Sequence, residues 1–176
     1  INQALIIGLS VLGIDATTAI HKEPPTKQRA NIACYESAYP HELIVGARKI
    51  IASAQTQSGG IFLQQGTLPL KQSGQYFGES LSIAREEKRL LAQRLDENTA
   101  IPSQLLGRDV TIEETQDALI SGFEKAWNIL LTKSEMSSEE HKYAHHLVQI
   151  KYSDETWTTE GISEQQQSKN MGARTI

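Results

Sequence analysis

The chain has 176 residues, of which 39% are hydrophobic and 22% charged, with a formal net charge of -4 and an isoelectric point near 5.7. This length suggests one domain, and the composition is that of a globular protein and not of a disordered one. Because lysine and arginine are scattered and the net charge is negative, nucleic acid is not expected as the main partner. The single cysteine, Cys34, excludes an internal disulfide, so we expect a free thiol and a cytoplasmic location.

Residues 1–13 are apolar and predict a buried helix that ends at Gly13, where glycine tolerates a left-handed backbone. The run is too short to span a bilayer and lacks the basic region of a signal peptide, so we expect no membrane anchor. Because the first residue is Ile1 and not methionine, we expect the chain to begin within a longer protein.

The next part of the chain has the pattern of a β-sheet. Residues 14–16 predict a short strand, and residues 21–31, which include Pro24-Pro25, predict a loop. Three further strands are predicted at residues 42–45, 49–54 and 61–64. Because tight turns at Gly46-Ala47 and Ser58-Gly59-Gly60 join them, we expect an antiparallel sheet.

Three helices are predicted downstream, where the hydrophobic period becomes helical. Residues 83–95 predict the first, with one apolar face formed by Ile83, Leu90, Leu91 and Leu95. Capping boxes begin the second helix at Thr111 and the third at Ser137. Their expected apolar faces are Leu119, Ile120, Phe123, Trp127 and Leu130 in the second and Tyr143, Ala144, Leu147 and Val148 in the third.

Cys34 and Lys49 are the candidate chemical groups. A thiolate is a nucleophile, and a neighbouring ammonium stabilises it and can shuttle its proton. Alternation along the predicted strand places Lys49, Ile51 and Ser53 on one face. The alternatives are that Cys34 is a small buried hydrophobic residue and that Lys49 is a solvated lysine beside Arg48.

Other motifs are weaker. Gly59-Gly60 and Gln65-Gly66-Thr67 either bring backbone amides close to a ligand or simply form hairpin turns. His141 and His145 have the spacing of two metal ligands on a helix, but no acid or further ligand completes a motif, so we predict no metal site. The chain has no Walker-type glycine loop, zinc-ribbon cysteine pair or Gly-x-Ser-x-Gly elbow.

Five segments resemble, in order, the lipoate-protein ligase and octanoyltransferase superfamily, whose members share a catalytic domain with biotin ligases. They are residues 33–37, 46–55, 63–70, 122–124 and 151–157. The resemblance covers residues 1–157 and implies an α+β fold, with a mixed or antiparallel sheet flanked by helices and a helical C-terminal part. It implies that residues 1–132 are the C-terminal portion of a catalytic domain and residues 133–157 a helix and closing segment. Residues 158–176 lie beyond the resemblance, and their polar composition predicts a disordered tail.

Within this resemblance, Cys34 stands where the cysteine-dependent octanoyltransferases carry their acyl-accepting cysteine. Lys49 stands where the family places a lysine against the acyl carbonyl or the thiol. The implied activity is transfer of octanoyl from acyl-carrier protein, through a Cys34 thioester, to a lipoyl-domain lysine. We expect Ser53, Gly66 and Thr67 to bind the substrate, without a cofactor.

The implied acceptors are lipoyl-domain proteins such as the glycine-cleavage H protein or 2-oxoacid dehydrogenase subunits, and neither nucleic acid nor membrane is an expected partner. Two alternatives stay open. One is an ATP-dependent lipoate-protein ligase, in which Lys49 binds the carboxylate and adenylate and no cysteine is needed. The other is a non-catalytic fragment that only binds a lipoyl domain.

The chain departs from the family pattern at two places. Family members carry an upstream Arg-Arg-x-Thr-Gly-Gly stretch and a histidine that line the acyl pocket, and no such stretch occurs in these 176 residues. Gln65 stands where the family commonly has histidine, which removes a titratable group but keeps hydrogen-bonding capacity.

Overall fold

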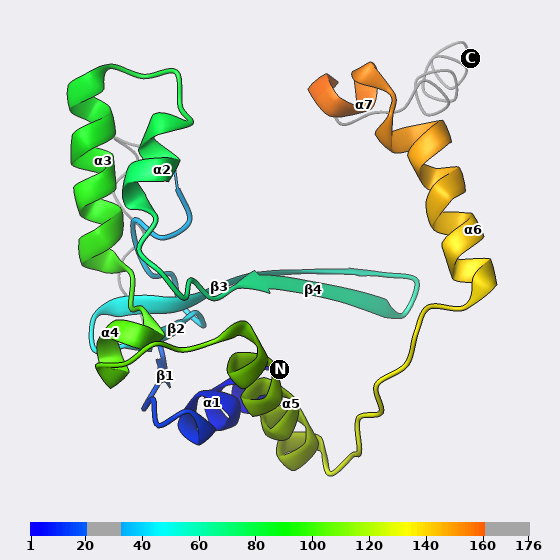
Figure 1. The fold of residues 1–176 in the computed structure, drawn as a ribbon, viewed down its shortest axis with the longest axis horizontal. Coiled ribbons are helices and arrows are strands. Elements are labelled where there is room, and N and C mark those ends of the chain that lie inside the picture. Colours follow the sequence, from blue (N-terminus) through cyan, green and yellow to red (C-terminus); the bar gives the residue numbers. More distant parts are fainter. Residues whose placement is uncertain (21–32, 161–176) are drawn as a thin grey trace. The chain divides into compact units, whose positions relative to one another are not determined.

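The computed structural model describes residues 1–20 and 33–160 (Figure 1). The chain divides into two compact units, of which the first is Ile1–Leu131 and the second begins at Thr132. The described part of the first unit combines an antiparallel sheet with helices, whereas that of the second contains helices and no strand. The predicted α+β fold is therefore confirmed. The predicted three-part division of the chain stays a prediction.

The sheet of the described residues has four strands, which lie side by side in chain order and are all antiparallel to their neighbours. They are β1 (Thr17–Thr18), β2 (Leu43–Val45), β3 (Arg48–Ser58) and β4 (Ile61–Thr67). The strand predicted at residues 14–16 is wrong, because pairing begins at Thr17 while Ile14 and Ala16 are buried in the core. The other three predicted strands are confirmed, and β3 and β4 extend further to form a long hairpin (Figure 1).

β3 contains one extra residue opposite β2. Leu43 pairs with Ile51, but the next residue of β2, Ile44, pairs with Lys49, so Ile50 has no counterpart. Neighbouring residues of β2 point to opposite faces, and their partners must do the same. Lys49 therefore lies on the opposite face from Ile51, and the prediction that Lys49, Ile51 and Ser53 share one face is wrong.

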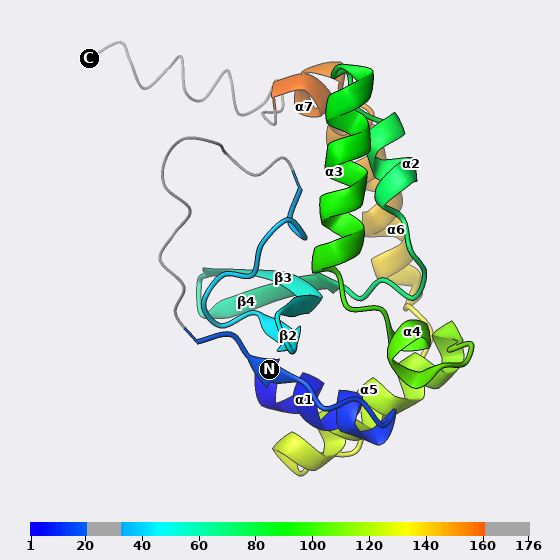
Figure 2. The same cartoon turned by 90° about the vertical axis from the view of Figure 1, so that its left-hand side faces the viewer.

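The helices α1 (Asn2–Val11) and α5 (Ile112–Trp127) lie side by side in both views (Figures 1 and 2). Glycines permit this close crossing: a Cβ at Gly122 would overlap the backbone of Ala4 and Gly8. As predicted, the first helix stops before Gly13, which has a φ of +88°. The main core includes residues of both helices and of the sheet, among them Leu9, Leu12, Leu43, Ile50, Ile51 and Ala118.

A second helical pair consists of α2 (Gly74–Glu79) and α3 (Arg85–Asn98). α2 was not predicted from the sequence, and it packs on α3 through Gly74 and Gly78, where a Cβ would meet helix backbone. Leu91 and Leu95 are buried as predicted, but Leu90 is 41% exposed. Neighbouring helical residues point about 100° apart, so Leu90 cannot share the face of Leu91.

α5 begins at the predicted residue, but its capping box is only half formed. The Thr111 hydroxyl accepts a hydrogen bond from the Glu114 amide at 3.1 Å, whereas the Glu114 carboxylate pairs with Arg108 at 2.5 Å. The helix ends at Trp127 because Asn128 adopts a left-handed backbone, so Leu130 lies beyond it. Ile120 and Trp127 are exposed, at 42% and 47%, so the predicted apolar face is wrong at Ile120, Trp127 and Leu130. A short helix that was not predicted, α4 (Pro102–Leu106), lies before α5 in the chain.

The described part of the second unit contains α6 (Ser138–Leu147), the π-helix η1 (Val148–Tyr152) and α7 (Glu155–Glu160). The capping box of Ser137 and Glu140 is confirmed with both hydrogen bonds present. The predicted apolar side of this helix is wrong in that Tyr143, Ala144 and Val148 are exposed. The start of the predicted disordered tail belongs to α7, whereas the rest of the tail and the loop predicted at residues 21–31 lie outside the described residues.

In the described ranges, the helices are too short or too polar for any of them to cross a membrane.

The close crossing of α1 and α5 predicts a specific sensitivity at Gly122. We expect Gly122→Ala to lower the free energy of unfolding by about 1–3 kcal/mol, because the added methyl group meets rigid backbone of α1. Urea denaturation measures the change, with Lys125→Ala on the exposed side of the same helix as the control. A Gly122→Ala protein as stable as the parent would contradict the close packing.

Candidate functional site

Cys34 lies in a turn formed by residues 33–36 and is exposed to solvent. The Glu36 amide donates a hydrogen bond to the Ala33 carbonyl at 3.2 Å, and the Ala33 amide donates to the Glu36 carboxylate at 2.9 Å. These bonds close the turn around the cysteine. The alternative of a buried packing cysteine is therefore wrong.

Lys49 is buried beneath this turn, with a side chain that is only 1% exposed. Its ammonium donates a hydrogen bond to the carbonyl oxygen of Cys34 and forms an ion pair with the Glu42 carboxylate at 2.6 Å. The rings of Tyr35 and Tyr39 flank the ammonium, with centroids 5.8 and 5.7 Å from Nζ. The alternative of a solvated lysine is wrong, because Lys49 reaches the backbone of the candidate nucleophile.

Tyr35 joins the cysteine turn to the sheet. Its hydroxyl donates to the Thr67 carbonyl at 2.6 Å and accepts from the Ala52 amide at 3.2 Å. Ala52 and Thr67 are the pair of β3 and β4 that lies farthest from the hairpin turn. The Thr67 hydroxyl lies 3.1 Å from the Tyr35 hydroxyl. Burial raises the pKa of the Tyr35 phenol above its usual value of 10.0, and the hydrogen bonds of Thr67 and Ala52 oppose part of this change.

Glu36 attaches the same turn to α3. Its carboxylate lies 3.3 Å from the Arg94 guanidinium, and its backbone carbonyl accepts a hydrogen bond from the Asn98 side chain at 3.1 Å. Three neighbouring residues are therefore held by the fold: Cys34 by β3, Tyr35 by β3 and β4, and Glu36 by α3. The backbone that carries the exposed thiol is thus attached to both the sheet and α3.

A pocket of about 360 Å³ opens beside Cys34, between the turn, the end of β4 and the helices α2 and α3. We call it the thiol pocket. Its wall is mostly apolar, with Phe77, Leu95 and Ile101, and its polar groups include the exposed Lys71. A substrate that reacts at Cys34 has room to enter here.

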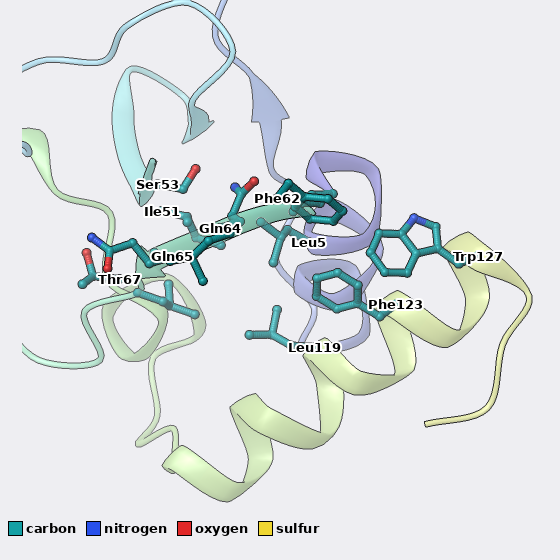
Figure 3. A pocket seen from close by; sticks show the side chains of 14 residues that line it. Leu5, Ile51, Ser53, Phe62, Gln64, Gln65, Thr67, Leu119, Phe123 and Trp127 are labelled. Atoms are coloured by element: carbon teal, nitrogen blue, oxygen red, sulfur yellow. The ribbon is translucent and has the colours of Figure 1, made fainter. Parts of the chain in front are cut away.

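A second pocket, of about 460 Å³, lies between the β3–β4 hairpin and the helices α1 and α5 (Figure 3). We call it the helix pocket. Figure 3 shows Leu5, Leu119 and Phe123 on the helical side and Ser53 on the sheet side. Its apolar character comes from both helices and from the hairpin.

Four of the five predicted site residues line these two pockets, whereas the buried Lys49 lines neither. Ser53 and Gly66 line the helix pocket, Cys34 lines the thiol pocket, and Thr67 lines both. The extra residue in β3 explains the division, because it turns Ser53 to the face opposite Lys49. The structure thus brings Lys49 and Cys34 together and separates them from Ser53.

Sequence reasoning missed Glu42 and the structural role of Tyr35. Glu42 precedes β2 and reaches Lys49 only because β2 and β3 are paired. No short sequence motif predicts that Glu42 and Lys49 form an ion pair. The one available signal was the position of Lys49 in a strand next to apolar residues, since a lysine that becomes buried there requires a partner.

Solved structures establish the type of fold. The chain aligns with a crystal structure of lipoate-protein ligase A bound with ATP, with a TM-score of 0.65 and 22% identity over 89% of this chain and 55% of that one. It also aligns with a bi-partite lipoate protein ligase from Thermoplasma acidophilum, with a TM-score of 0.67 and 23% identity over 89% and 54% of the two chains. The fold is therefore that of the lipoate-protein ligases.

The chain belongs to the lipoyl protein ligase A/B catalytic domain family, whose family model matches residues 1–124. It is 32% identical to the octanoyltransferase LipM of Geobacillus kaustophilus over 162 residues and 32% identical to that of Bacillus subtilis over 163 residues. Both alignments cover 89% of this chain and 58% of the relative. The chain thus spans less than two thirds of the length of these relatives, and the predicted superfamily resemblance is confirmed.

The Tyr35 hydroxyl predicts a pH-dependent contribution to stability. Tyr35→Phe leaves the Ala52 amide without its acceptor, so we expect a loss of about 1–3 kcal/mol near neutral pH. Because the pKa of Tyr35 is raised in the folded protein, the unfolded chain ionises first and the contribution falls as the pH rises above 10.0. Urea denaturation of both proteins from pH 7 to 11 measures this; a constant difference would contradict it.

Proposed function

We propose that this chain carries the thiol centre of an octanoyltransferase, which moves octanoyl from acyl-carrier protein to a lysine of a lipoyl domain. The observation that carries the proposal is the exposed Cys34 on a turn whose carbonyl is held by the buried Lys49. The LipM relatives, which are named octanoyltransferases, support it. A cytoplasmic reaction fits the free cysteine.

The proposed reaction has two acyl-transfer steps. In the first, the Cys34 thiolate attacks the carbonyl carbon of octanoyl-acyl-carrier protein, the new carbon–sulfur bond forms, and the carrier leaves as its thiol after taking up a proton. In the second, the neutral ε-amine of a lipoyl-domain lysine attacks the Cys34 thioester. An amide forms, the amine loses a proton, and the cysteine thiol is regenerated. Because a thioester is exchanged for a thioester, the first step needs neither ATP nor a cofactor.

Lys49 would stabilise the charge that develops in both steps. An ammonium has three N–H donors, of which one is directed to the Cys34 carbonyl and one to the Glu42 carboxylate. Because Lys49 is only 1% exposed and lines neither pocket, it would act on the acyl oxygen through its charge and through the Cys34 turn that it holds. A cation that is fixed in place lowers the energy of an oxyanion more than a mobile one does.

Thr67 is the proposed substrate contact shared by both pockets. The thiol pocket gives access to Cys34, and the apolar helix pocket beyond Thr67 has Ser53 and Gly66 on its wall. An acyl group has no charge, so walls such as Phe123 and Phe62 suit it better than they suit a polar ligand. Ser53 and Gly66 would then contact the distal part of the substrate and not its reacting carbonyl.

An ATP-dependent lipoate-protein ligase is the second candidate. It is favoured by the fold shared with lipoate-protein ligase A, whose structure was determined with ATP. In that reaction Lys49 would bind a carboxylate or adenylate and Cys34 would have no role. The exposure of Cys34 beside Lys49 favours the transferase, because the ligase reaction has no step that uses a thiol.

Intact-mass spectrometry of the purified protein tests the proposal. After incubation with octanoyl-acyl-carrier protein and no ATP, we expect an octanoyl adduct that is lost in Cys34→Ser and that passes to an added lipoyl domain. The thiol alone differs between the two proteins, so the adduct must depend on Sγ.

Two other outcomes would contradict the transferase. Modification of the lipoyl domain only after addition of ATP and free lipoate, with Cys34→Ser as active as the parent, would establish the ligase. Binding of a lipoyl domain with no covalent product under either condition would establish a non-catalytic binding protein.

A further inference from the structure

Glu42 is the residue that holds the Lys49 ammonium in place. Its Oε2 lies 2.6 Å from Nζ, and its side chain is itself only 17% exposed. No other ion pair of Lys49 occurs among the described residues, and the remaining polar contact of the ammonium is the Cys34 carbonyl. The direction of this ammonium therefore depends on one carboxylate.

A cation as buried as Lys49 needs a counter-charge. Burial removes the water that stabilises an ammonium, and an uncompensated buried charge strongly destabilises the arrangement around it. A carbonyl oxygen such as that of Cys34 supplies only part of a charge, and the rings of Tyr35 and Tyr39 lie near the outer limit for a favourable cation–π contact. The carboxylate of Glu42 provides the missing full charge.

Glu42 is fixed by bonds of its own. The Tyr39 amide donates to its Oε2 at 2.7 Å, and the Ala19 amide donates to its backbone carbonyl at 2.8 Å. Its neighbour Leu43 begins β2, which pairs with the strand that carries Lys49. The carboxylate is thus set by the sheet and by the turn before it, and it approaches Lys49 from a defined side.

We propose that Glu42 is a positioning residue, which directs the Lys49 ammonium onto the Cys34 carbonyl and so holds the thiol where it reacts. The expected effect on catalysis rests on the proposed transferase function, whereas the role of Glu42 in holding Lys49 does not. Glu42 touches no reacting atom; it acts through Lys49. The contacts run from Glu42, just before β2, to the Lys49 ammonium and from there to the backbone carbonyl of Cys34.

Glu42→Gln tests the catalytic part. The amide keeps the size and one acceptor of glutamate but removes the charge, so the volume of the side chain is unchanged while the ammonium loses its counter-ion. We expect kcat for octanoylation of Cys34 to fall by roughly 10- to 100-fold with KM changed less than about 2-fold. Glu42→Asp, which keeps the charge, should recover part of the loss.

Glu114→Gln is the matched control. It removes the carboxylate from another close ion pair, at 2.5 Å from Arg108, but this pair is exposed on α5 and has no contact with the cysteine turn. We expect its kcat to equal that of the parent. An equal fall in both variants, or no fall in Glu42→Gln, would overturn the proposal.

Hydrogen exchange provides a test that needs no substrate. We expect the hydrogen-bonded amides of Ala33 and Glu36 to exchange at least about 10-fold faster in Glu42→Gln, because the Cys34 carbonyl loses its anchor. In a Lys49→Met background, the same substitution should add nothing, since the lysine through which it acts is gone. Faster exchange in both backgrounds would mean that the Glu42 carboxylate acts through its hydrogen bond with the Tyr39 amide and not through Lys49, and would overturn the proposal.

The two readouts separate this inference from the function on which it rests. If the parent protein forms no octanoyl adduct but Glu42→Gln accelerates exchange only when Lys49 is present, the transferase proposal fails and the holding role of Glu42 stands. If the parent forms the adduct and Glu42→Gln neither slows it nor alters exchange, the transferase stands and the role of Glu42 is refuted.

Discussion

The need to keep a charged ammonium in the interior determines how the centre of the first unit is built. Lys49 is almost completely buried, and its charge is balanced by Glu42 from the neighbouring segment. Its backbone is also tied to the following part of the chain, because the Lys49 carbonyl accepts a hydrogen bond from the Ala100 amide at 2.8 Å. Strand pairing, the cysteine turn and the connection after α3 therefore meet at one residue.

Local patterns predicted much of this fold. The strands around Gly46 and Gly59-Gly60, the caps at Thr111 and Ser137, and the helix end at Gly13 depend on a few neighbouring residues, so the sequence was sufficient for them. α2 escaped prediction because it is short and packs through glycines, which give no hydrophobic period. The Glu114 carboxylate pairs with Arg108 instead of completing the capping box, and this pairing depends on the path of the preceding loop.

The candidate site was predictable in its chemistry but not in its arrangement. Resemblance to the family identified Cys34 and Lys49, and the structure brings them into contact. The contact is to the backbone of Cys34, which no motif specifies. Glu42 was not predicted, because its distance from Lys49 in the fold is set by pairing between strands. Ser53 was assigned to the face of Lys49 because strict alternation was assumed, and the unpaired Ile50 breaks it.

The unpaired Ile50 affects how residue roles can be transferred between homologues. Aligned positions in β3 normally keep the same orientation, so a role assigned in one protein is copied to the next. In a relative that lacks a counterpart of Ile50, the residue aligned with Ser53 would face the thiol instead of the helices. Roles should therefore be transferred along this strand by hydrogen-bond register, and deleting one residue here would turn Ser53 away from the helix pocket.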